Sequence, residues 1–424
     1  MDSEKINTAH RPFEALEIGA FRWFVAYRFF FTFGLQMLAT IAGWQIWAMT
    51  HSKIQLGYAG LVEAIPSIGM ALYAGHIADK YARKKVALGA MIFIQLSVLG
   101  LLIGFWLGRD LSFSAFIFAA LFGVGFGRSF MAAASFASLG TLIPKEKMSN
   151  AVSWSSTIWQ MGMITGPAAG GLFYSFLSSR SEFAFEWCYA VVLAFLFVGF
   201  LAFSRIPIPH VPPVTQQEKI WDRLTSGLKY VFQHKVLLSA FSLDLFAVLF
   251  GGAVAILPVF ADEVLKAGAV QLGWLRAAPA IGSAGMAMML AFRKPMKNAG
   301  KNLLWAVFGF GICMIGFGLS THFWVAFFFL FFSGVLDSIS VVIRNTITQL
   351  YTPDEMRGRV SAVSSMFIGS SNEIGAFESG LAAQSMGLVP SLLFGGSMTI
   401  MIVGMIAWKA PALRALSLRD PQQE

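Results

Sequence analysis

Long apolar runs separated by short charged segments are the feature that most limits how this chain can fold. An α-helix needs about 20 apolar residues to cross about 30 Å of hydrocarbon, and most of the runs reach or exceed that length. Charged residues make up only 12% of the chain, whereas soluble domains carry roughly 25%. The short alternating segments typical of a membrane β-barrel are absent from the sequence. We therefore expect an all-α integral membrane protein.

The apolar runs and the residues that interrupt them predict twelve transmembrane helices. The expected spans are 23–49, 55–78, 86–107, 111–142, 148–176, 185–203, 236–260, 271–292, 303–319, 323–350, 360–386 and 389–408. An even number of spans places both termini on the same side of the membrane. The first span has no basic, cleavable leader before it, so we expect it to act as its own insertion signal.

The distribution of basic residues predicts which side that is, because cytoplasmic loops of membrane proteins are enriched in Lys and Arg. With both termini in the cytoplasm, 23 of the 31 basic residues fall in cytoplasmic segments. Four lie in loops on the other side, namely Lys53, Arg109, Arg180 and Lys266. Four lie within spans, namely Arg28, Arg128, Arg276 and Arg344. This asymmetry also explains the net charge of +9 without nucleic acid, and it favours a multi-pass membrane protein with both termini in the cytoplasm.

The longest connection divides the chain into two parts of similar size. It opens with a proline cluster and continues as an amphipathic segment, which favours a linker helix lying along the membrane surface over a partner-binding site. The expected segments are a cytoplasmic N-terminus at 1–22, a six-helix bundle at 23–203, the linker at 204–235, a second six-helix bundle at 236–408 and a cytoplasmic tail at 409–424.

The two parts repeat one another in sequence. Residues 55–71 align without gaps on residues 271–287, at an offset of 216, with nine identities in 17 positions. Residues 144–172 align on residues 353–381, at an offset of 209, with seven identities in 29 positions. The same order and nearly the same offset predict two pseudo-symmetric bundles in the same orientation, related by an axis along the membrane normal.

The basic turn GHIADKYARKKV, residues 75–86, lies between the second and third expected spans. Asp79 is an acid at a helix end, where it is favourable only opposite a helix N-terminus or a neighbouring arginine. The surrounding bases hold the turn at the lipid headgroups, and a solvated topology signal is the simpler alternative. The corresponding loop of the second part, AFRKPMKNAGKN, keeps the bases but has no acid.

This turn resembles the signature loop of the major facilitator superfamily of transporters. The resemblance rests on Gly75, Asp79, Lys80, Arg83 and Lys84, although Ala82 stands where the signature usually has a second glycine. Together with WAMTHSKIQLG and YTPDEMRGRVSAV, the turn resembles the branch that includes bacterial enterobactin exporters and multidrug efflux proteins. The resemblance covers nearly the whole chain and implies two six-helix bundles that rock about a central site.

The fifth expected span contains QMGMITGPAAGG, which resembles the motif of proton-coupled antiporters in this superfamily. Its members are Gly162, Gly166, Pro167, Gly170 and Gly171. Small residues at this spacing let helix backbones approach closely, and the proline bends the helix. Ordinary helix packing therefore accounts for the motif equally well.

Ionisable residues inside the spans are the sharpest functional signal, since each costs at least about 2.5 kcal/mol at the bilayer centre unless it is paired or hydrated. They are Arg28, Glu63, Arg128, Asp244, Arg276, Asp337, Arg344, Glu373 and Glu378. Arg128 and Asp337 occupy equivalent positions in the repeat with opposite charge, and the resemblance implies that their helices line the cavity. We expect these two to face each other in a coupling or substrate site, with Glu63, Glu373, Arg28 and Asp244 as further members. A structural ion pair that joins the two bundles is the alternative.

The resemblance also implies a cytoplasmic latch. Asp79 would dock near Arg344, Arg357 and Arg359, at the cytoplasmic side of the tenth and eleventh spans. Because the second part lacks the matching acid, this latch is expected on one side only.

These features predict a secondary transporter that exports a small amphipathic molecule, siderophore-like or drug-like, by proton antiport. A lipid flippase, an importer and a membrane sensor or scaffold are the alternatives. No phosphate loop, catalytic cluster or metal-ligand spacing occurs in the sequence, so we expect no enzyme activity, cofactor or metal. The expected partners are the small-molecule substrate, protons and membrane lipid, and the protein is expected to be a monomer that binds no nucleic acid.

Overall fold

A computed structural model shows how these segments are arranged. It describes residues 13–70, 73–74, 77, 81–107, 113–144, 147–208, 220–291, 296, 298–353 and 356–417. Within these ranges every regular element is helical, which confirms the expected all-α membrane architecture.

The helices fall into two groups on either side of residues 204–235, here called the first half and the second half. The first half contains a short 3-10 turn, Glu14–Glu17, and α1 (Gly19–Thr50), α2 (Lys53–Gly69), α4 (Arg83–Leu107), α5 (Phe113–Leu142), α6 (Met148–Ser178) and α7 (Ala184–Ser204). The second half contains α9 (Lys235–Gly251), η3 (Val254–Ile256), α10 (Leu257–Val259), the π-helical turn η4 (Phe260–Val264), α11 (Ala269–Ala291), α12 (Ala299–Gly318), α13 (Phe323–Leu350), α14 (Arg357–Met386), α15 (Leu388–Lys409) and α16 (Pro411–Arg414). Helix α8 (Ile220–Gln233) lies between the halves in the sequence.

Seven stretches of helix in the described residues are long and apolar enough to span a bilayer. They are Gly19–Thr50, Arg83–Gly104, Ala184–Ser204, Lys235–Val264, Ala299–Gly318, Phe323–Leu350 and Leu388–Lys409. Each expected span contains described helical residues, and the count of twelve stays a prediction. Several helices begin before the expected span, as α12 does at Ala299 rather than Leu303, because an apolar run marks the hydrocarbon layer and the helix continues beyond it.

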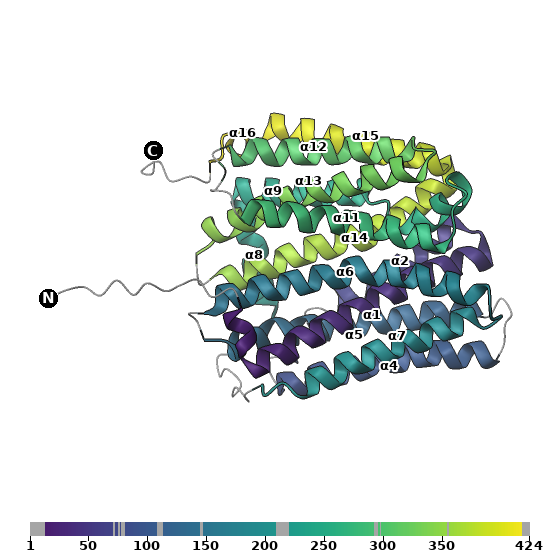
Figure 1. Cartoon of the computed structure of the whole chain (residues 1–424). Coiled ribbons are helices and arrows are strands. Elements are labelled where there is room, and N and C mark those ends of the chain that lie inside the picture. The colour runs from purple at the N-terminus through teal and green to yellow at the C-terminus, as the bar shows by residue number, and fades with distance from the viewer. Residues whose placement is uncertain are drawn as a thin grey trace.

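The long helices run side by side, with the first half and the second half on opposite sides of the molecule (Figure 1). We call the end where α1 begins and α15 ends the basal end, and the end where α1 meets α2 the distal end. Across the boundary between the halves, α6 packs against α11 and α2 packs against α14. These two contacts form the seam of the molecule.

Near the distal end the seam closes through direct contact between helix backbones. A Cβ at Gly171 would collide with the carbonyl oxygen of Ala269, and a Cβ at Gly380 would lie 2.9 Å from the carbonyl oxygen of Lys53. The repeat relates the two contacts, since Gly171 corresponds to Gly380 at an offset of 209 and Lys53 to Ala269 at an offset of 216. The duplicated sequence therefore builds the same close crossing twice, once on each side of the seam.

The linker helix α8 packs on the second half at the basal end. A Cβ at Gly227 would lie 3.0 Å from the backbone oxygen of Arg359, and the Arg359 guanidinium donates a 2.9 Å hydrogen bond to Ser226 Oγ. The hydroxyl of Tyr230 donates to the carbonyl of Tyr351 at 2.7 Å. The amphipathic segment is thus fastened to α14 and to the end of α13.

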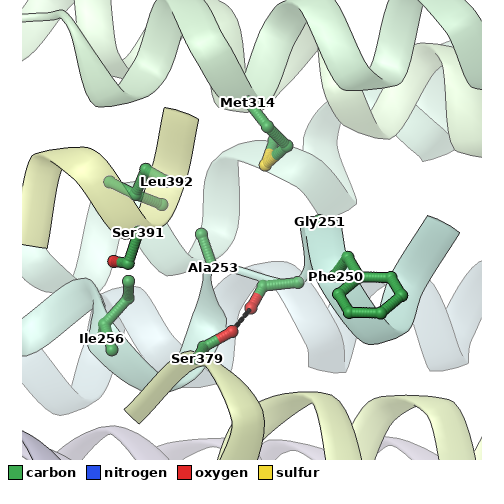
Figure 2. Close-up of a pocket in the computed structure, with 9 residues that line it drawn as sticks. Phe250, Gly251, Ala253, Ile256, Met314, Ser379, Ser391 and Leu392 are labelled. Atoms are coloured by element: carbon green, nitrogen blue, oxygen red, sulfur yellow. Dashed lines mark hydrogen bonds between the residues drawn. The ribbon is translucent and has the colours of Figure 1, made fainter. Parts of the chain in front are cut away.

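The span expected at residues 236–260 is not one continuous helix. Helix α9 ends at Gly251, and Gly252 has a ψ of 96°, an extended conformation that interrupts the helical hydrogen bonds. Ser379 Oγ donates a 2.7 Å hydrogen bond to the carbonyl of Gly252, and the two groups meet beside a small pocket (Figure 2). The chain then continues through η3 and α10 to the end of η4 at Val264, so the expected span is present as Lys235–Val264, with a break inside it.

Candidate functional site

The first group of charges inside the spans lies at the seam and consists of Glu63, Arg128 and Arg276, here called the seam cluster. Arg128 Nη1 of α5 forms an ion pair with Glu63 Oε1 of α2. A Cβ at Gly125 would collide with the backbone of Glu63, so α5 approaches α2 closely enough for this pair because that position is glycine. The Arg128 side chain is 46% exposed and that of Glu63 17%, which leaves the pair accessible.

Arg276 adds a second guanidinium to the seam cluster from the other half. Its Nη1 donates a 3.0 Å hydrogen bond to the carbonyl of Ala39 in α1. Arg276 also interacts electrostatically with Glu63. The sequence marked Arg276 as a charge within a span, but its partners lie 237 and 213 positions away and could not be read from the pattern.

A second group of charges lies inside the second half and consists of Asp244, Asp337, Ser340 and Arg344, here called the inner cluster. Arg344 Nη1 of α13 forms an ion pair with Asp244 Oδ2 of α9, and both side chains are only 7% exposed. Asp337 interacts electrostatically with both members of the pair. Asp244, Asp337 and Ser340 line a small cavity between α9, α12 and α13, with room for about one water molecule.

The expected pairing of Arg128 with Asp337 is not what the structure shows. Arg128 pairs with Glu63 in its own half, whereas Asp337 lies beside Asp244 and Arg344 in the other half. Equivalent positions in the repeat therefore belong to two separate clusters, because each finds a charged partner on a neighbouring helix of its own bundle.

Two further expected members of the site are assigned to neither cluster. Arg28 lies in α1, and its buried Nε finds no hydrogen-bond partner among the described residues. Glu373 lies on α14, with its side chain outside the described part of the structure. Arg28 and Glu373 remain predictions as site residues.

The expected latch is only partly within the described residues. Gly75, Asp79 and Lys80 lie outside them, as does the side chain of Arg357. Arg83 begins α4, and Lys84 Nζ donates a 2.7 Å hydrogen bond to the carbonyl of Ile206 just beyond α7.

The two remaining latch arginines have partners within the second half. Arg344 lies in the buried pair with Asp244, and Arg359 is bonded to the linker helix at Ser226. The latch itself stays a prediction.

The glycine-proline motif of α6 divides between two neighbouring helices. Cβ atoms at Gly162, Gly166 and Gly170 would press on α1 within the first half. Gly171 faces the backbone of α11 across the seam, and the carbonyl of Pro167 lies 2.6 Å from a Cβ built at Gly273 of that helix. The motif thus packs α6 against both halves at once, which is a structural use for every one of its residues.

The distal end carries polar contacts across the seam that the sequence did not reveal. Trp47 Nε1 donates a 2.9 Å hydrogen bond to Asp262 Oδ2, and Lys53 Nζ lies 2.9 Å from Glu263 Oε2. Both acids lie in η4, which the apolar pattern left outside the seventh span. A helix that runs past its apolar segment gives no composition signal, so these contacts could not be predicted.

Comparison with known proteins identifies the family. The sequence model described as Major Facilitator Superfamily matches residues 24–376. The chain belongs to this superfamily. The resemblance seen in the motifs is thereby confirmed, and the protein is a multi-pass member of a superfamily of transporters rather than of enzymes.

Among curated relatives of this superfamily member, the enterobactin exporter EntS of Shigella flexneri is 27% identical over 347 residues, covering 81% of this chain and 80% of that protein. The enterobactin exporter EntS of Escherichia coli O1:K1 is 26% identical over 345 residues, with the same coverage.

Solved structures show the same fold at low sequence identity. A POT family transporter in complex with a thioalcohol-conjugated peptide superposes with a TM-score of 0.73 at 13% identity, covering 94% of this chain and 96% of that one. A D-xylose-proton symporter superposes with a TM-score of 0.70 at 13% identity, covering 94% and 99%. A bacterial homologue of the human lysosomal transporter Spinster superposes with a TM-score of 0.67 at 14% identity, covering 93% and 96%.

Proposed function

We propose that this protein is a secondary active transporter that exports a small amphipathic molecule, siderophore-like or drug-like, by proton antiport. It would lie in a bacterial inner membrane with the basal end toward the cytoplasm, and the two halves would rock about the seam. The similarity to enterobactin exporters supports export and the substrate class.

The observation that carries this proposal is the seam cluster. Glu63, Arg128 and Arg276 come from three helices and from both halves, and they meet where the halves part. Charges inside a membrane span are costly, so their placement at the seam favours a substrate or ion pathway over simple packing. Helices from opposite halves that share one charged site are what alternating access requires.

The distal crossings support one particular state of the cycle. With Gly171 against Ala269 and Gly380 against Lys53, the seam is closed at the distal end. In the proposed orientation this is the state in which a molecule from the cytoplasm would load. Export would then require these two crossings to separate together.

The test is a thermal-shift screen of the purified full-length chain against siderophores, amphipathic drugs and lysolipids, followed by flux of each hit in vesicles with and without a pH gradient. Stabilisation by a siderophore or drug and flux that follows the gradient outward would support the proposal. Stabilisation by lysolipids alone would replace it with a flippase, and inward flux would replace it with uptake. Identical melting in every compound would overturn it.

A further inference from the structure

The cavity of the inner cluster lies inside the second half and away from the seam. It is lined by α9, by α13 and by Ala306, Val307 and Phe310 of α12. The main packing partners of α12 are α9, α13, α15 and α16, all in the second half. An ion in this cavity would therefore be separate from a substrate held at the seam.

The charges around the cavity do not balance. Asp244 and Arg344 neutralise one another, and Asp337 adds a second carboxylate to the same buried site. The Ser340 residue lines the cavity and is buried at 3% exposure, and its hydroxyl has no hydrogen-bond partner among the described residues. Asp337 is only partly buried, so this surplus carboxylate is partly removed from water, and beside an unsatisfied hydroxyl it indicates a missing ligand, since an uncompensated charge taken out of water is unfavourable.

The other helices packed on α9 are α14, α15, α8 and α16, and α11, which packs on α13, carries Arg276, bonded to Ala39 across the seam. α15 contributes the neutral Thr399, whose hydroxyl donates to the carbonyl of Ala247 at 3.4 Å. α14 carries Glu373 and Glu378, and Gly375 between them packs on the backbone of Val248 and Leu249. Glu378 is not among the residues that line the cavity.

We propose that the inner cluster is the coupling-ion site of the transporter, and that it binds one proton on Asp337 beside a water molecule held by Ser340. This inference rests on the proposed function. A metal cation fits the site less well, because the cavity has room for about one water and the neighbouring Arg344 guanidinium repels a second positive charge.

Loss of the proton from Asp337 changes which carboxylate forms an ion pair with Arg344. The O–H bond of Asp337 breaks, the proton passes to the cavity water as hydronium and leaves with it, and the carboxylate keeps the electron pair. Asp337 then competes with Asp244 for Arg344, which lies seven residues further along the same helix, about 10 Å. Weakening the Asp244 contact loosens α13 from α9.

This exchange connects the proton to the distal end. Helix α9 continues through the break at Gly252 into η4, which holds the first half through Asp262 and Glu263. A change in the contact between α13 and α9 therefore acts on η4, whose side chains bond to the first half beside the distal crossings.

The experiment is difference infrared spectroscopy of the purified full-length protein between mildly acid and alkaline pH, a range in which exposed carboxylates stay ionised and only a shielded carboxylic acid shows the carbonyl stretch of its protonated form. The wild type is expected to lose one such band on going to alkaline pH. Asp337→Asn should remove the band. Asp244→Asn should also remove it, because Arg344 then pairs permanently with Asp337.

Control variants test whether the band belongs to Asp337 or to another nearby carboxyl group. Glu373→Gln and Glu378→Gln should keep the band, and Ser340→Ala should keep it at a higher frequency, since the carbonyl loses a hydrogen bond. Persistence of the band in Asp337→Asn, or its loss in Glu373→Gln, would overturn the assignment. Loss of the wild-type band on adding sodium chloride at constant acid pH would assign the site to sodium instead.

The two proposals fail in different ways. If the band belongs to Asp337 but flux ignores the pH gradient, proton antiport is wrong while the proton site stands. If flux follows the gradient in both the wild type and Asp337→Asn, antiport stands and the site is wrong.

Discussion

The molecule contains two arginine–carboxylate pairs of similar chemistry in different surroundings. The Glu63–Arg128 pair at the seam has side chains that are 17% and 46% exposed, whereas both members of the Asp244–Arg344 pair are 7% exposed. In the accessible pair, either side chain can replace its contact with the other by a contact with substrate or water at a small cost in free energy. In the buried pair, neither side chain can give up the other without leaving an unpaired charge away from water, which is strongly unfavourable. We therefore expect this pair to separate only when a third group, Asp337, changes its charge.

The largest expected effect comes from breaking the buried pair. Arg344→Met should destabilise the protein by about 3–5 kcal/mol, because it leaves buried carboxylates without a counter-charge. The loss should be greatest at alkaline pH, since both carboxylates must take up protons to remain buried and cannot do so there. Thermal unfolding in detergent across a pH series measures it. The double variant Asp244→Asn/Arg344→Met should recover part of the lost stability, because only Asp337 is then left without a counter-charge. Unchanged melting of Arg344→Met would show that the buried pair does not stabilise the fold.

The distal crossing should respond next. Gly380→Leu forces a side chain into the backbone of α2 and should cost about 1–3 kcal/mol by overpacking. The distal end should then stay open, which labelling of Ala269→Cys by a maleimide reports, because Ala269 is buried and its backbone meets Gly171 across the seam. Gly369→Leu on the same helix is the matched control, since a Cβ there meets nothing within 4 Å. Equal labelling rates in the two variants would show that the crossing at Gly380 does not close the distal end.

Breaking the Glu63–Arg128 pair should lower the transport rate while leaving the stability of the protein nearly unchanged. Arg128→Gln should cost no more than about 1 kcal/mol of stability, because the pair is partly exposed. It should nevertheless lower flux at least about tenfold, since one charged hydrogen bond contributes about 1.5–3 kcal/mol. Flux of any thermal-shift hit in vesicles measures this. Arg180→Gln, in the distal connection after α6, is the control and should transport normally. A large loss of stability in Arg128→Gln would make the seam pair structural.

The smallest effect is expected at the distal rim. Lys53→Met removes the bridge to the 41%-exposed Glu263 and should cost about 0.2–1 kcal/mol, a contribution that salt screens. Melting at low and high salt should therefore differ in the wild type and coincide in Lys53→Met. An equal salt dependence in both would show that the bridge contributes nothing.

The sequence predicted the arrangement of spans and the repeat because both depend on local composition and on alignment of the chain with itself. It also identified every charge in both clusters as a group inside a span. It did not predict the partners, since Asp244 and Arg344 lie 100 positions apart and the repeat suggested Arg128 and Asp337 instead. Pairing depends on which neighbouring helix presents an opposite charge at the same depth, and no periodicity encodes that.

The break after α9 shows a second limit of sequence reasoning. Gly251 and Gly252 lie within an apolar run, where hydropathy predicts an uninterrupted helix. The carbonyl released by the break is bonded to Ser379, a residue 127 positions away on α14. When the free carbonyl at a helix break is satisfied by a hydroxyl far away in the sequence, the local hydropathy pattern does not indicate the break.

The paired crossings at Gly171 and Gly380 have a consequence for regulation. Where backbone meets backbone, the contact contains no group that protons or salt can charge or discharge, so its strength is the same in acid and in base. A pump with such a closure needs its sensor elsewhere, and the buried acids of the second half are placed to serve as one. In the proposed cycle the duplicated glycines Gly171 and Gly380 form the closure, and protonation of Asp337, which has no counterpart acid in the first half, controls when it opens.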